Sequence, residues 1–335
     1  MTGFELYLRA NAKAFDRYLL TFFGDGTHPD MGRYLYAPLR KFSDNSGKRH
    51  RPLICLLACE AVGGDPKRAW PAAAAIEHFH TAALIHDDIE DGSLTRRDEP
   101  CMHVCEGEGL AINAGDLALA LVCGTVVNDP GLDDATKIRV LAELVDMTTR
   151  TIEGQALDIG WARDGRFDLG LGDYLAMANH KTAYYSGAVP LAVGAIVGGG
   201  STAQVETLRA FGMATGLAFQ IQDDVLNLVG AKESTKKDYR SDVAEGKRTL
   251  VAIHALQNSR RKRRLLEILS MRSGDPAILA EAVEIMEEAG SIAYARTYAY
   301  DLVAEAKQGL IDALPKTRAR DLLASMADFF IQRSA

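Results

Sequence analysis

The sequence predicts an all-α fold of about ten or more helices, because long stretches repeat their apolar residues at helical three-and-four spacing. No stretch alternates with period two for long, and hairpin signals such as Asn-Gly are absent. The chain has 335 residues and is 47% hydrophobic, which is ample for a large core. No segment has the composition of a flexible tether, so we expect one domain over residues 1–335.

Two helices expected in the first half of the chain could be mistaken for a signal peptide or a transmembrane segment. The segment from Glu5 to Asp16 mixes charged and apolar residues as an amphipathic helix does, and we expect no signal peptide. Gly109 to Val127 is nearly apolar over 19 residues, but Asn113 and Asp116 interrupt it. These polar residues favour a helix buried in the protein, so we expect no transmembrane segment.

Capping patterns predict the boundaries of later helices. Ser201 and Gln204 have the spacing of a capping box, and the apolar-striped helix that they open runs to Val229. Aspartate caps helix N-termini, and proline cannot continue a helix. Further boundaries are expected at Asp133-Asp134, Asp275-Pro276 and Pro315.

Charge and cysteine content exclude some classes of protein. The net charge is −7, and a nucleic-acid partner would need a concentrated basic face. The one dense basic run, 260–264, lies beside leucines and an isoleucine and is typical of the solvated side of a helix. Five cysteines at irregular spacing do not indicate a disulfide framework, and Cys101 and Cys105 lack a second ligand pair for zinc. We expect no nucleic acid partner and a cytoplasmic location.

Two acidic clusters each end an apolar helical run. The first holds Asp87, Asp88 and Asp91, whose spacing places three carboxylates on one edge of a helix. Their repulsion is best relieved by a cation, and Mg²⁺ commonly bridges one or two carboxylates to substrate phosphates. The second cluster repeats this spacing with Asp223, Asp224 and Asn227. One such cluster is typical of a solvated helix end. Two of them beside apolar walls indicate a cavity for a diphosphate with a hydrocarbon tail.

Basic residues at several places in the chain suit such a substrate. Arginine forks match phosphate oxygens, and lysine acts as a point charge. Each of these residues alone could be surface decoration. They are found at 48–51, at 96–97, and at Lys181, Lys237 and Lys247.

Seven segments, taken in order, resemble those of the trans-type polyprenyl diphosphate synthases, which include the farnesyl and geranylgeranyl diphosphate synthases. The resemblance covers about 200 residues, and it implies a helical bundle of the isoprenoid synthase type around a central substrate cavity. The segments are GKRHRP (47–52), HTAALIHDDIEDGSLTRR (80–97), INAGDLALA (112–120), EGQALDI (153–159), DYLAMANHKTAYYS (173–186), FQIQDDVLNLVG (219–230) and SDVAEGKRTL (241–250).

The resemblance also implies roles for single residues. Three magnesium ions would be held on an allylic diphosphate by Asp87, Asp88, Asp91, Asp223 and Asp224, with Asn227 as a weaker ligand. That diphosphate would be surrounded by Arg96, Lys181, Thr182, Gln220, Lys237 and Lys247. The diphosphate of isopentenyl diphosphate, which needs no metal, would be bound by Lys48, Arg51, His80 and Arg97. The implied reaction is ionisation, condensation and proton loss, and the departing diphosphate takes the proton.

Two positions depart from the family pattern. Asn227 stands where many members have aspartate, although some geranylgeranyl-type members also carry asparagine there. Asp98 stands where glycine is usual, and it places a negative charge beside the expected isopentenyl site.

The length of the product depends on residues before the first acidic cluster. Ala82 and Ala83 leave open a pocket that a bulky aromatic residue would close for a farnesyl product. Phe79 lies about 12 Å from Asp87 along the helix, and we expect it to help form a floor that gives geranylgeranyl diphosphate. It could equally be an ordinary core residue, and neighbouring helices could set the limit, so farnesyl or longer products stay open.

Two other functions are weighed against synthesis. A class I terpene cyclase shares the aspartate-rich cluster, but it usually carries glutamate where this chain has Ala231, and it needs no isopentenyl pocket. A non-catalytic regulatory subunit would be expected to lose acidic or basic positions that this chain keeps. The resemblance also implies a homodimer, with Gly109 to Val127 as a candidate interface helix.

Overall fold

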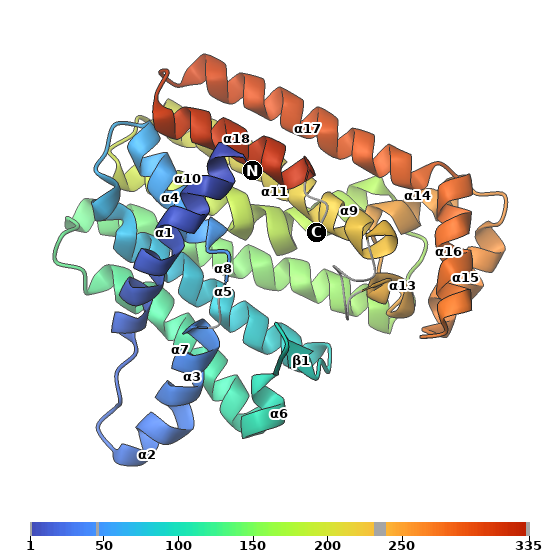
Figure 1. The fold of residues 1–335 in the computed structure, drawn as a ribbon, viewed down its shortest axis with the longest axis horizontal. Coiled ribbons are helices and arrows are strands. Elements are labelled where there is room, and N and C mark those ends of the chain that lie inside the picture. The colour runs from blue at the N-terminus through green and yellow to red at the C-terminus, as the bar shows by residue number, and fades with distance from the viewer. Residues whose placement is uncertain (1, 45–46, 231–238, 333–335) are drawn as a thin grey trace. The chain divides into compact units, whose positions relative to one another are not determined.

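Helices dominate the computed structural model, which describes residues 2–44, 47–230 and 239–332 (Figure 1). The all-α prediction is confirmed. Within the described part, the sheet is limited to a hairpin of β1 (Thr95–Arg96) and β2 (Glu99–Pro100). The helices of the first 130 residues are α1 (Gly3–Leu19), η1 (Leu20–Phe22), α2 (Pro29–Met31), η2 (Gly32–Tyr36), α3 (Ala37–Asp44), α4 (His50–Ala61), η3 (Pro66–Ala69), α5 (Trp70–Glu90), α6 (Met102–Glu106) and α7 (Glu108–Val127).

The later helices are longer on average and include one extended π-helical turn, η4. In chain order they are α8 (Asp134–Arg163), α9 (Leu171–Ala178), η4 (Asn179–Ala188), α10 (Val189–Val197), α11 (Thr202–Val229), α13 (Ser241–Ala244), α14 (Leu250–Asn258), α15 (Lys262–Met271), α16 (Pro276–Glu288), α17 (Ser291–Ala313) and α18 (Arg318–Gln332).

The chain forms two compact units, and each is built from three stretches of sequence. Unit 1 takes its described residues from Met1–Asp146, Pro190–Glu206 and Leu314–Leu323. Unit 2 takes them from Met147–Val189, Thr207–Ala313 and Ala324–Ala335. The first acidic cluster therefore belongs to unit 1 and the second to unit 2.

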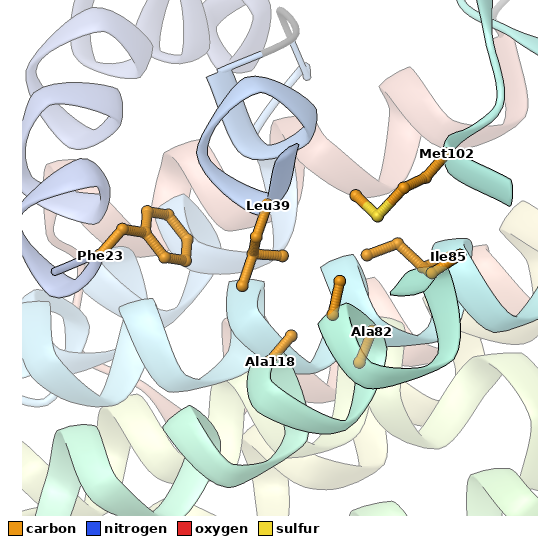
Figure 2. Close-up of a cluster of buried hydrophobic side chains, with 8 residues drawn as sticks. Phe23, Leu39, Ala82, Ile85, Met102 and Ala118 are labelled. Atoms are coloured by element: carbon orange, nitrogen blue, oxygen red, sulfur yellow. The ribbon is translucent and has the colours of Figure 1, made fainter. Parts of the chain in front are cut away.

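Small residues let α5 and α7 pack closely in unit 1. Ala82 of α5 and Ala118 of α7 are fully buried in an apolar cluster with Phe23 and Leu39 (Figure 2). Gly115 of α7 packs so tightly on α5 that a Cβ there would collide with the imidazole of His86. This close approach fixes the end of α5, which carries the first acidic cluster.

Close glycine contacts also position η4 in unit 2. A Cβ on Gly187 of η4 would collide with the carbonyl of Gly212 in α11, and a Cβ on Gly154 of α8 would collide with the backbone of Lys181. The backbones can approach only because both positions lack a side chain. η4, a π-helical segment of ten residues between α9 and α10, carries Lys181 and Thr182.

The predicted helix boundaries are confirmed. Ser201 and Gln204 form a capping box, with the backbone nitrogen of Ser201 2.9 Å from Gln204 Oε1 and that of Gln204 3.3 Å from Ser201 Oγ. Asp133 Oδ1 accepts from the backbone of Thr136 at 2.9 Å, and Asp275 caps α16. The basic run at 260–264 leads into the first turn of α15, and its Arg261 and Arg264 pair with Glu281.

α7 is less buried than the sequence suggested. Ile112 and Val127 on its outer face are 45% and 51% exposed. By length and composition alone α7 could cross a membrane, but a core helix passes the same test.

Candidate functional site

The first acidic cluster lies at the C-terminal end of α5, where Asp91 follows the last helical residue. Asp88 is 1% exposed, and its Oδ1 accepts hydrogen bonds from Nε and Nη2 of Arg96 at 2.8 and 2.7 Å. Burial lowers the pKa of Arg96, but the Asp88 carboxylate outweighs burial and raises that pKa above its ordinary value. Arg96, expected to bind the allylic diphosphate, is thus held against one of the expected metal ligands.

Arg96 is the last residue of β1, whereas Arg97 lies in the two-residue turn that follows, so their side chains have different orientations. The turn consists of Arg97 and Asp98, with φ of 53° and 65°, and Arg96 pairs with Glu99 across the hairpin. Positive φ at both central residues is the requirement of a tight hairpin turn, which explains why glycine is usual at the position of Asp98. Aspartate tolerates this conformation better than most residues. The hairpin was missed from the sequence because Arg-Asp is not a hairpin signal.

Two residues expected to bind isopentenyl diphosphate, Arg51 of α4 and His80 of α5, lie together in unit 1. Nη1 of Arg51 lies 3.1 Å from Nε2 of His80. Burial, followed by the charge of Arg51, holds the pKa of His80 well below its ordinary value, so the ring is neutral. Since arginine can only donate, Nε2 accepts and the ring proton is on Nδ1. Lys48 is exposed, while Arg51 is 7% exposed.

In unit 2, Asp224 of the second acidic cluster belongs to a hydrogen-bond network of polar side chains. Oδ1 of Asp224 accepts from Nε2 of Gln220 at 2.7 Å, and Oδ2 accepts from the hydroxyl of Tyr174 at 3.1 Å. Gln220 in turn accepts from the hydroxyl of Thr182 at 2.9 Å. Burial and the charge of Asp242 raise the pKa of Asp224 well above its ordinary value. Asp224 therefore orients Gln220, whereas its neighbour Asp223 is only half-buried.

Lys181 and Lys247, the two expected phosphate-binding lysines that the structure describes in unit 2, each pair with a carboxylate. Nζ of Lys181 donates to Asp158, and Nζ of Lys247 lies 3.4 Å from Asp242 and 2.9 Å from Glu245. Asp158, Asp242 and Tyr174 were given no role from the sequence, although all three lie inside segments that carry the family resemblance. Tertiary contacts rather than spacing reveal them.

Asn227 has a local structural function. Its Oδ1 accepts from the backbone N–H of Asp242 at 3.2 Å, and its Nδ2 donates to Ser241 at 3.0 Å. It thereby holds the start of α13, which leads to Lys247. The amide uses both of its polar atoms here, one as acceptor and one as donor.

The donor atoms suit magnesium shared with a substrate. Among the described residues, no group of three histidine, cysteine, aspartate or glutamate side chains could hold a metal by itself. Oδ2 of Asp88 is buried and has no hydrogen-bond partner in the described part of the chain. Mg²⁺ prefers oxygen ligands and often takes only one or two carboxylates, with phosphates and water completing the shell. The acidic residues present fit that pattern.

The candidate product-length residues divide between two environments. Phe79 and Ala82 are 3% and 0% exposed, and Ala82 packs in the cluster shared with α7. Ala83 is half-buried and lies one helical turn before Asp87. Of the two alanines, Ala83 is the one on the same face as the acidic cluster.

The structure thus assembles the expected residues in two separate groups. Unit 1 holds Lys48, Arg51, His80, Asp87, Asp88, Asp91, Arg96 and Arg97, and unit 2 holds Lys181, Thr182, Gln220, Asp223, Asp224, Asn227 and Lys247. Lys237 lies outside the described residues. That both groups face one cavity stays a prediction.

Known proteins resemble the chain over almost its full length. The family model for polyprenyl synthetase matches residues 32–286. A short chain isoprenyl diphosphate synthase of Methanothermobacter thermautotrophicus is 44% identical over 287 residues, which are 86% of each chain. The crystal structure of a geranylgeranyl pyrophosphate synthetase from Pyrococcus horikoshii covers 98% of both chains with a TM-score of 0.90 and 32% identity. That of a geranylgeranyl pyrophosphate synthase from Corynebacterium glutamicum, complexed with isoprenyl diphosphate and magnesium, covers 99% of both chains with a TM-score of 0.86 and 28% identity.

Proposed function

The chain belongs to the polyprenyl synthetase family, and we therefore propose that it is a magnesium-dependent prenyltransferase that joins isopentenyl diphosphate to an allylic diphosphate. The observation that carries this proposal is the divergence of Arg96 and Arg97. Arg96 bonds Asp88 of the acidic cluster, whereas Nη2 of Arg97 lies near Gly47 in the basic loop. One arginine thus contacts the acidic cluster expected to bind magnesium, and the next lies beside the basic loop expected to bind isopentenyl diphosphate without metal. Such a pair suits an enzyme that binds two diphosphates.

The proposed mechanism uses charge stabilisation of a leaving group. Asp87, Asp88, Asp91, Asp223 and Asp224, with Asn227 as a weaker ligand, would hold magnesium, and the metal would supply charge stabilisation for the departing allylic diphosphate. Lys181, Lys247 and Arg96 would exchange their carboxylate partners for phosphate oxygens. Gln220, oriented by Asp224, would donate its second amide N–H to the same diphosphate, and the hydroxyl of Thr182 would exchange its bond to Gln220 for a phosphate oxygen. The double bond of isopentenyl diphosphate attacks the cation, and the released diphosphate takes the proton, so no side chain acts as general base.

We propose geranylgeranyl diphosphate as the product. The half-buried Ala83, one helical turn before Asp87, has too small a side chain to close the pocket on this face of α5. Phe79, about two turns before Asp87, is the candidate floor of the pocket. Two of the relatives named above are, by their names, synthases of short-chain isoprenyl diphosphate and of geranylgeranyl pyrophosphate. Farnesyl or longer products are the alternatives.

The family match extends from residue 32 to 286 and includes parts of both units. This supports the proposal that residues 1–335 act as a single synthase domain. A cytoplasmic location is also proposed, since all five cysteines are free.

We further propose a homodimer. Gly109 to Val127 in α7 stays the candidate interface helix expected from the sequence, and an outer face of α8 is a second candidate. Apolar residues exposed on one helix at heptad spacing are typical of a seam that packs against a second helix. Val145→Asp together with Ile152→Asp should therefore give monomers in sedimentation experiments. The large apolar residues exposed along α8 recur every seven positions and are Ile138 (68%), Val145 (55%), Ile152 (59%) and Ile159 (42%).

One experiment tests the proposed activity against its alternatives. Purified protein is incubated with magnesium, isopentenyl diphosphate and each allylic starter in turn, and the products are measured by mass spectrometry. A longer prenyl diphosphate is the expected result. A cyclic hydrocarbon formed without isopentenyl diphosphate would indicate a cyclase. No turnover alone, but an altered product when a partner synthase is added, would indicate a regulatory subunit.

A further inference from the structure

Arg49 is a buried arginine inside the basic loop and points away from solvent. It is 4% exposed and adopts a left-handed backbone conformation, with φ of 51°. Its Nε donates to Asp16 of α1 at 2.6 Å, its Nη1 donates to Glu77 of α5 at 2.5 Å, and its Nη2 donates to the carbonyl of Ser43. One guanidinium therefore connects the loop with α1, α3 and α5.

The neighbours of Arg49 in sequence are the residues expected to bind isopentenyl diphosphate. Lys48 precedes it and is exposed, and Arg51 follows two residues later at the start of α4. The helix α5 holds both arginines from one face, since Glu77 bonds Arg49 and His80, three residues on, contacts Arg51. A displacement of Arg49 would therefore move Lys48 and Arg51 relative to α5.

Glycine and charge complete this arrangement. A Cβ on Gly47 would lie 3.1 Å from Nη1 of Arg49 and 3.4 Å from Nη2 of Arg97, so the glycine lets both guanidiniums pack against the loop. Burial and the charge of Arg49 lower the pKa of Arg97, and Glu77 counteracts them. Glu77, which is 2% exposed, is thus the buried counter-charge for more than one arginine.

We propose that Arg49 is a positioning residue for isopentenyl diphosphate, and that its bonds to Asp16 and Glu77 hold Lys48 and Arg51 in the orientation that binds the diphosphate. Arg49 does not touch the substrate, since its donors are directed at α1, α3 and α5. The inference rests on the proposed function, because it assumes that Lys48 and Arg51 bind isopentenyl diphosphate. Binding of isopentenyl diphosphate would therefore depend on Arg49, although this residue makes no contact with the substrate.

The test compares Arg49→Lys and Glu77→Gln with the wild type and with Arg320→Lys. Lysine keeps the charge but cannot bridge two carboxylates as a planar fork does. Arg320 is also buried and bonds Asp321 and the carbonyl of Leu314, so its variant controls for the loss of a buried guanidinium. Calorimetry in chelator measures the Kd of isopentenyl diphosphate, and steady-state kinetics measures KM for each substrate.

Arg49→Lys should weaken isopentenyl diphosphate binding by about tenfold or more, since small misplacements of binding groups have effects of this size. KM for the allylic substrate and kcat at saturation should change less than about twofold, because the metal-linked group is untouched. Glu77→Gln keeps the bond between Arg49 and Asp16, so it should weaken isopentenyl diphosphate binding by a smaller factor. This variant also tests the inference if Arg49→Lys does not fold.

Two results would overturn the inference. One is wild-type affinity for isopentenyl diphosphate in a folded Arg49→Lys or Glu77→Gln variant. The other is an equal rise of both KM values, also seen in Arg320→Lys, which would show general destabilisation. A wild-type protein that neither binds isopentenyl diphosphate nor elongates any starter would instead refute the proposed function itself.

Discussion

Asp242 should make the stability of the protein fall as the pH rises from 5 to 8. Burial raises the pKa of this carboxyl from 3.8 to about 6, although Lys247 opposes the shift. Because the folded protein holds this proton more tightly than the unfolded chain, the stabilisation is complete below pH 3.8 and is lost as the pH rises through about 6. Between pH 5 and pH 8 the loss is about 1.4 kcal/mol.

The variant Asp242→Asn lacks this titration, so its stability should decline less over the same range. At about 2 °C per kcal/mol, the Tm difference between variant and wild type should move by about 3 °C in favour of the variant from pH 5 to pH 8. Thermal unfolding followed by circular dichroism in chelator gives both values, and Asp301→Asn, at an exposed position, is the control. A Tm difference that is the same at both pH values, or that moves in the opposite direction, would refute the reasoning.

Three further predictions concern packing, product and metal. Gly115→Ala should lower stability by about 1–3 kcal/mol because the methyl group would overpack against His86, and a denaturation midpoint equal to wild type would contradict this. Ala83→Phe should shorten the product with little loss of stability, whereas Ala82→Phe should overpack the core and lower the Tm. Mass spectrometry measures the product and thermal unfolding measures the Tm. An unchanged product from Ala83→Phe would exclude that position from the pocket. Chelation should stop turnover and leave isopentenyl diphosphate binding intact, and a rate undiminished without metal would rule out the assignment at Asp87.

Local signals in the sequence were sufficient for the helical architecture. Ser201 and Gln204 form the expected capping box, and the helix between them and Val229 has the expected ends. Such signals depend on residues close in sequence, which is why they transfer directly to structure. The β1–β2 hairpin was missed because Asp98 occupies a left-handed position without the usual glycine.

The expected site residues could be proposed from motifs, but their partners could not. Nothing in the spacing of Asp224 shows that Tyr174, 50 residues away, donates to it, or that Asn227 supports α13. Arg49 was one of several basic residues until its bond to Glu77 distinguished it from Lys48. Contacts between distant segments are properties of the fold, and sequence periodicity does not contain them.

The tight turn at Arg97 and Asp98 has a consequence for how this enzyme could change. Arg96 and Arg97 reach different partners because neighbouring residues of a hairpin project in different directions. Adding or removing one residue inside the β1–β2 hairpin would shift its pairing register and change the directions of both guanidiniums in a single step. In the proposed roles, each diphosphate would then lose its arginine, so the length of this hairpin should tolerate insertion far less than its composition tolerates substitution.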